Sequence, residues 1–124
     1  MTHSPSQFSA HLESREGAAV VVLLGELDID SAPELTALLA SVVENGPAEV
    51  IVECSGLSFI DSSGLSVLIA AQKRLTDRGA RLVVRSPRPN VLKVIEITRL
   101  GKYLNVDDGT AEGRRAPDPS PSPT

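Results

Sequence analysis

The fold of this chain is decided at residues 57–65, which read LSFIDSSGL. Just before them, residues 49–54 alternate apolar and charged side chains, as a half-buried strand does. From Leu65 to Leu75, apolar residues recur at helical spacing instead. The segment therefore places two serines and an aspartate at the junction between a strand and the N-terminus of a helix.

Outward from this junction, strand-like and helix-like patterns alternate along most of the chain. Strands are expected at residues 8–13, 18–25, 49–54, 81–85 and 103–106, and helices at 31–45, 65–78 and 89–101. Residues 20–24 are apolar on both faces, which predicts a central strand rather than an edge strand. Right-handed crossovers between successive parallel strands would place all the helices on one face of an α/β sheet.

The first helix carries start and stop signals in its sequence. Ser31 and Glu34 have the spacing of a capping box, and Pro33 suits the first turn. Gly46 suits a left-handed cap at the end of this helix, and the last helix is expected to stop at Gly101.

Composition limits the chemistry that the chain can perform. Its 124 residues carry 12 Lys+Arg and 16 Asp+Glu, a net charge of −4, without the basic cluster that nucleic acid requires. A single cysteine, Cys54, excludes an internal disulfide and a thiolate zinc cluster. It lies on the predicted core face and is interpreted as a small buried hydrophobe. His3 and His11 are the two histidines, so we expect no cofactor, no metal and no enzyme activity. A small hydrolase would have to recruit one of them to Ser62.

The two ends of the chain differ from the middle. Residues 1–7 form a polar lead-in, and residues 111–124 are rich in proline and lack any apolar residue larger than alanine. The tail is predicted to be disordered, and the folded domain to span residues 8–110. The longest apolar run, residues 18–24, is too short to cross a bilayer, so a cytoplasmic protein with no membrane contact is expected.

The motif Asp61-Ser62-Ser63-Gly64 is the strongest candidate site. Backbone N–H groups and the helix dipole at a helix N-terminus stabilise negative charge, so a phosphoryl group on Ser62 would be accommodated there. Phosphorylation adds close to two negative charges, enough to repel an acidic partner. The alternative interpretation is that Ser62 or Ser63 simply caps the helix.

A second candidate is Asp28, in the segment GELDIDS at residues 25–31. If the strands are parallel, this segment lies at the same sheet edge as Ser62, where α/β proteins bind ligands. Asp28 would then accept a hydrogen bond from Ser62 or bind a metal carried by a nucleotide partner. Alternatively, it is a turn residue that bonds its own backbone.

Together, GELDIDSAPEL at residues 25–35 and LSFIDSSGLSVLIAAQKRL at residues 57–75 resemble the STAS domain of bacterial anti-sigma factor antagonists. The resemblance covers residues 8 to about 108 and implies a mixed sheet of about five strands, with helices packed mainly on one face. In that family, the unmodified antagonist binds an anti-sigma factor with a GHKL-type serine kinase fold and so releases a sigma factor. Phosphorylation ends binding, and a PP2C-type phosphatase restores it.

The resemblance also implies roles for individual residues. The phosphoacceptor of the family falls on Ser62, and Asp28 and Asp61 match its acidic positions beside that serine. With Ser63 and Gly64, these residues are the predicted partner-binding site of a monomer or weak dimer. STAS domains also serve as constitutive scaffolds that phosphorylation does not regulate, and this is the alternative function. The intact motif favours the phosphorylation switch.

Overall fold

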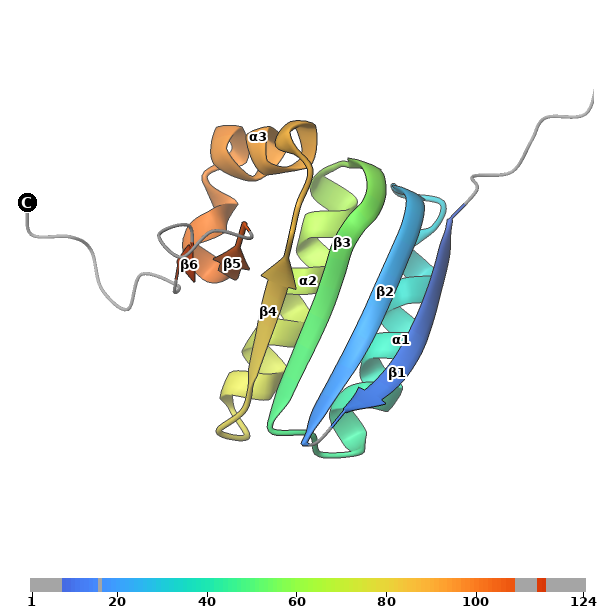
Figure 1. Ribbon diagram of the computed structural model, residues 1–124, viewed down its shortest axis with the longest axis vertical. Coiled ribbons are helices and arrows are strands. Elements are labelled where there is room, and N and C mark those ends of the chain that lie inside the picture. The colour runs from blue at the N-terminus through green and yellow to red at the C-terminus, as the bar shows by residue number, and fades with distance from the viewer. Residues whose placement is uncertain (1–7, 16, 109–113, 116–124) are drawn as a thin grey trace, which may run out of the picture.

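The sheet of this protein is mixed and follows the order of the chain (Figure 1). A computed structural model describes residues 8–15, 17–108 and 114–115. Its strands are β1 (Ser9–Arg15), β2 (Ala18–Leu27), β3 (Glu49–Ile60), β4 (Arg81–Arg85), β5 (Asn105–Asp107) and β6 (Arg114–Arg115). Its helices are α1 (Ala32–Glu44), α2 (Ser62–Thr76), α3 (Pro89–Thr98) and the 3-10 helix η1 (Leu100–Tyr103).

Strands β2 to β5 are parallel, whereas β1 and β6 are antiparallel to their neighbours. The central position predicted for residues 20–24 is confirmed, since β2 lies between β1 and β3. The two-residue strand β6 adds to the five expected strands and falls inside the predicted tail. The other residues of 111–124 and all of 1–7 lie outside the described residues, so the disorder expected of the tail remains a prediction.

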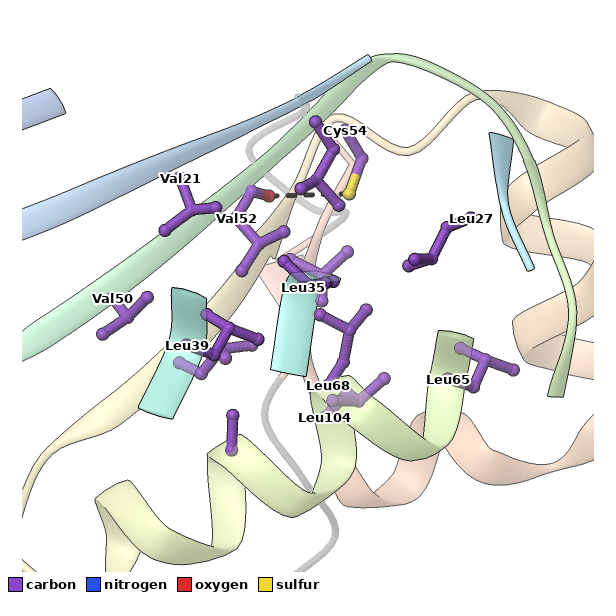
Figure 2. Close-up of a cluster of buried hydrophobic side chains, with 14 of the residues drawn as sticks. Val21, Leu27, Leu35, Leu39, Val50, Val52, Cys54, Leu65, Leu68 and Leu104 are labelled. Carbon is purple, nitrogen blue, oxygen red and sulfur yellow. Dashed lines mark hydrogen bonds between the residues drawn. The ribbon is translucent and has the colours of Figure 1, made fainter. Parts of the chain in front are cut away.

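The core lies between the sheet and the helices that cover one of its faces, as predicted (Figures 1 and 2). Figure 2 shows valines of β2 and β3 facing leucines of α1 and α2. Each such side chain contributes about 2 kcal/mol when buried. Cys54 belongs to this core, and burial, aided by the charge of Glu53, raises the pKa of its thiol to about 12. The interpretation as a buried hydrophobe is confirmed.

The charges that alternate with these core residues lie on the other face of the sheet. There Arg81 pairs with Glu49 at 2.7 Å, and Arg85 pairs with Glu53 on the neighbouring strand. Such partly exposed ion pairs contribute at most about 1 kcal/mol each. The predicted division of the strands into an apolar and a charged face is therefore confirmed.

Helix ends agree with the sequence signals in part. Gly46 has a φ of 70°, as predicted for a left-handed residue after α1. The expected stop of the last helix at Gly101 is wrong. Helix α3 ends at Thr98, Arg99 adopts the left-handed conformation with a φ of 61°, and η1 follows. Gly101 instead packs closely, because a Cβ there would lie 2.9 Å from Ile95 Cγ2.

Candidate functional site

The candidate site is built where two parallel strands end side by side. Leu27 and Ile60 are paired as the last residues of β2 and β3, and the N–H of Asp61 donates to the carbonyl of Leu27 at 3.2 Å. Asp28 and Asp61 each follow one of these strand ends, so the two motifs are brought to one edge of the sheet, as predicted. The edge is the carboxyl edge, at which open α/β sheets carry their ligand sites.

Helix α2 is capped by Asp61. This residue is extended, with φ −121° and ψ −173°, and its Oδ1 accepts a hydrogen bond from the N–H of Gly64 at 3.1 Å. Such a cap stabilises a helix by about 1 kcal/mol. The alternative in which Ser62 or Ser63 caps the helix is therefore wrong, because the aspartate before them fills that position.

Ser62 is consequently the first residue of α2 and has no capping role. Its side chain is exposed, and within the described part of the chain its hydroxyl makes no hydrogen bond. Its backbone carbonyl accepts from the Ser66 hydroxyl at 2.8 Å, which belongs to the next turn. Ser63 is half-buried. The hydroxyl of Ser62 is thus accessible at the positive end of a helix dipole.

Gly64 allows α2 to approach the sheet edge closely. A Cβ at this position would lie 2.6 Å from Leu27 Cγ and 2.9 Å from Ile60 Cγ1, both in fully buried side chains. Glycine is therefore required for packing, and this packing fixes the start of α2 against the ends of β2 and β3. The partner-binding role that the resemblance gives Gly64 remains a prediction.

Asp28 forms a closed network with Ser31. Its Oδ1 accepts from the N–H of Asp30 at 3.0 Å and from the N–H of Ser31 at 3.1 Å. The N–H of Asp28 donates to the Ser31 hydroxyl at 2.9 Å, and that hydroxyl lies 2.9 Å from the Glu26 carbonyl. The backbone N–H of Ser31 is the main cause that lowers the pKa of Asp28 below its ordinary value.

This network decides between the two interpretations of Asp28. The residue bonds its own backbone, and the predicted hydrogen bond from Ser62 is not formed. The expected capping box is also wrong, because the side chain of Ser31 makes no cap hydrogen bond. Ser31 is 4% exposed, and its hydroxyl turns back toward β2 and away from the helix.

Sequence reasoning missed the apolar side chains beside this site. Ile29, next to Asp28, is 70% exposed, and Phe59, two residues before Asp61, is 43% exposed. The signal in the sequence for Ile29 was its place between two aspartates, whereas Phe59 lies in an apolar pair with Ile60 and gave no such signal. Exposed apolar side chains next to a charged motif are typical of protein-binding surfaces.

The remaining candidates do not join the site. His11 lies on β1, where its Nε2 is 3.4 Å from a carboxylate oxygen of Glu13. No cluster of acidic, histidine or cysteine side chains suited to a metal occurs among the described residues. Within the same part of the chain, no helix is long and apolar enough to span a membrane. His3 lies outside the described residues.

The mixed sheet with helices on one face defines an α/β domain of the STAS class. A family model described as "Mlab, STAS domain" matches residues 10–106, so the chain belongs to the STAS-domain family. The expected fold and family are therefore both confirmed.

Several of the similar proteins are anti-sigma factor antagonists. The anti-sigma-B factor antagonist of Staphylococcus aureus is 29% identical over 86 residues, which cover 69% of this chain and 80% of that protein. An anti-sigma factor antagonist from Mycobacterium paratuberculosis has a TM-score of 0.77 at 26% identity, covering 90% of this chain and 93% of that chain. The anti-sigma factor antagonist SpoIIAA in its unphosphorylated form has a TM-score of 0.69 at 27% identity, covering 84% of this chain and 90% of that chain. Bacillus SpoIIAA in its phosphorylated form has a TM-score of 0.63 at 26% identity, covering 84% of this chain and 94% of that chain.

Proposed function

We propose that this protein is a cytoplasmic anti-sigma factor antagonist with no catalytic activity of its own. In its unphosphorylated form it binds an anti-sigma factor with a GHKL-type serine kinase fold, and this binding releases a sigma factor. The kinase transfers the γ-phosphoryl group of ATP to the Ser62 hydroxyl, which ends the binding. A PP2C-type phosphatase hydrolyses the phosphoserine and so restores binding to the anti-sigma factor.

The observation that carries this proposal is the state of Ser62. Its hydroxyl is exposed at the first position of α2 and makes no hydrogen bond to the described residues, since Asp61 provides the cap. A kinase can therefore reach the hydroxyl without breaking a native hydrogen bond. The positive end of the α2 dipole also favours the added charge, so phosphorylation leaves the fold intact.

The surroundings of Ser62 support a switch that acts on binding. Ile29 and Phe59 offer exposed apolar surface near the motif, and an interface over them would desolvate the serine. A charge that is buried at such an interface without a partner costs a few kcal/mol, or about two to three decades in affinity. A phosphate at this position is therefore sufficient to reverse binding, although no other contact changes.

The proposal is tested by affinity capture from lysate of the source organism. The baits are the full-length wild type, Ser62→Ala, Ser62→Asp and the matched control Ser41→Asp, which places the same charge on an exposed residue of α1. Mass spectrometry identifies the retained proteins and the phosphorylation of Ser62. We expect a GHKL-type kinase on every bait except Ser62→Asp.

The purified kinase then provides a direct assay. Incubation with Mg-ATP should phosphorylate the wild type and Ser63→Ala but not Ser62→Ala, and a PP2C-type phosphatase should remove the group. If all four baits retain the same partners, the switch is wrong and the constitutive scaffold replaces it. Retention by Ser62→Asp but not by Ser41→Asp would place the binding surface elsewhere.

A further inference from the structure

Strand β1 presents an open edge. It is the outermost strand on one side of the sheet, and within the described ranges no strand pairs with its outer edge (Figure 1). Its seven residues pair with β2 in an unbroken register, without a bulge or a proline. All of them are exposed except Ala10, which is partly buried. A regular, exposed edge strand is a template for pairing with another chain.

The two faces of β1 carry different side chains. Leu12 pairs with core residue Val21, so it lies on the face that the helices cover, yet it is 43% exposed. It lines a groove of about 520 Å³ together with Val42 of α1 and Pro47. His11 and Glu13 alternate with Leu12 and therefore lie on the opposite face of the sheet.

We propose that two copies of this chain associate by antiparallel pairing of their β1 strands, centred on Leu12. A twofold axis at this residue places Leu12 of each copy opposite its counterpart. It also places His11 of each copy opposite Glu13 of the other, which gives two symmetric polar pairs. Imidazole and carboxylate attract and form hydrogen bonds, so both central polar pairs are favourable.

The neighbouring symmetric registers lack this complementarity. An axis at His11 places the two imidazoles opposite each other, and an axis at Glu13 opposes two carboxylates, which is destabilising. The Leu12 register also joins the two exposed leucines on the helix side, where each monomer leaves its groove partly open. A self-complementary patch of this kind gives a closed twofold dimer. This dimer does not depend on Ser62, so its failure would leave the proposed function unaffected.

Cysteine crosslinking of the full-length chain tests the register. Opposed residues of an antiparallel pair have Cα atoms about 4.5–5.5 Å apart, within disulfide range. We expect Leu12→Cys to form a disulfide-linked dimer on mild oxidation. The native Cys54 is buried, and the wild type measures its background.

Two matched variants control the crosslinking. Ala10→Cys and Ser14→Cys each lie about 13 Å from their own counterpart in this register, so neither should crosslink. Each variant has an altered residue on β1, and circular dichroism checks its fold. Crosslinking of Leu12→Cys at only the level of these controls would overturn the proposal. Stronger crosslinking of His11→Cys than of Leu12→Cys would also overturn it, because the twofold axis would then lie at His11.

A charge exchange measured by sedimentation equilibrium tests the polar pairs. Glu13→Lys removes the carboxylate acceptor that faces His11 at both symmetric positions and should weaken the dimer about tenfold or more. The double variant His11→Glu/Glu13→Lys places opposite charges at both positions and should recover wild-type association. A wild type that stays monomeric up to millimolar concentration overturns the proposal, as does a double variant that associates no better than Glu13→Lys.

Discussion

Helices α1 and α2 begin at the same edge of the sheet, each next to an aspartate and a serine, yet the two serines differ in burial and in hydrogen bonding. At the start of α1, Ser31 is 4% exposed and its hydroxyl bonds within the Asp28 turn. At the start of α2, Ser62 is exposed, and Asp61 makes the capping bond without it. One serine is part of the fold, whereas the other is available for modification.

The two junctions differ in which backbone N–H groups the carboxylate bonds. Asp28 precedes Ser31 by three residues, which lets the carboxylate and the hydroxyl close a turn around the backbone N–H groups between them. Asp61 directly precedes Ser62, and its carboxylate reaches past the serine to the N–H of Gly64. Ser62 is exposed and makes no part of this capping bond.

Gly64→Ala should have the largest effect on this comparison, because it separates α2 from the strand ends. The added Cβ would collide with the buried side chains of Leu27 and Ile60, an overpacking that costs about 3 kcal/mol. Urea unfolding measures the loss. Gly79→Ala is the control, since a Cβ there meets no atom within 4 Å and its φ of 76° costs only about 1 kcal/mol. Equal losses would show that α2 tolerates a wider spacing.

Ser31→Ala should break the first junction. Removal of its hydroxyl takes one hydrogen-bond partner from the N–H of Asp28 and from the carbonyl of Glu26 in a part-buried turn. The expected loss is about 2 kcal/mol in the free energy of unfolding. Ser31→Thr is the control: it keeps a hydroxyl at this position, so a smaller loss than in Ser31→Ala would assign the effect to the hydrogen bonds. A loss below about 0.5 kcal/mol for Ser31→Ala would mean that water replaces the hydroxyl in the turn.

Asp61→Ala should have an intermediate effect. The N–H of Gly64 loses its acceptor, and helix caps contribute about 1 kcal/mol. Asp61→Asn should retain most of that stability, because asparagine caps helices about as well as aspartate. Thermal unfolding of the two variants gives the comparison. If Asp61→Asn were as unstable as Asp61→Ala, the charge of Asp61, rather than its hydrogen bond, would stabilise α2.

Ser62→Ala should leave stability almost unchanged, within about 0.5 kcal/mol, because its exposed hydroxyl bonds to no described residue. The same substitution at Ser31 thus has a several-fold larger effect, although both are serines at helix starts. Urea unfolding of both variants under one set of conditions provides the test. A loss at Ser62 equal to that at Ser31 would mean that its hydroxyl supports the fold and is not reserved for modification.

Much of the fold was predictable because periodicity records which face of each element is buried. Residues 49–54 alternate between apolar and charged side chains, which predicted a strand with one solvent-exposed face. Residues 20–24 are apolar throughout, which predicted a central strand. The stop at Gly101 was predicted wrongly, because glycine serves equally as a left-handed cap and as a close packing residue. Here Arg99 takes the cap position, and Gly101 lies against Ile95.

The site was predictable in its location but not in its hydrogen bonds. Parallel strands place Asp28 and Asp61 at one edge, and this follows from topology alone. Which oxygen accepts from which N–H depends on local dihedral angles, such as the extended ψ of −173° at Asp61, that residue types do not specify. Serine and aspartate are equally good N-caps, so neither propensity nor spacing excluded Ser62 from that role.

Asp28→Asn differs from the other variants because its effect on stability depends on pH. The backbone N–H of Ser31 is the main cause that lowers the pKa of Asp28 below its ordinary value of 3.8. A carboxylate with a lowered pKa stabilises the fold above that ordinary value, and this contribution is lost as pH falls through the pKa of the folded state. The wild type should therefore exceed Asp28→Asn in stability at neutral pH, with the difference shrinking below about pH 3.8.

Urea unfolding from about pH 6 to about pH 2.5 measures this difference in stability. Asp30→Asn is the control, because Asp30 is exposed and its carboxylate accepts none of the hydrogen bonds that Asp28 accepts. Parallel stability curves for the wild type and Asp28→Asn would show that the turn holds Asp28 as a neutral acceptor and that its charge contributes nothing to the first junction.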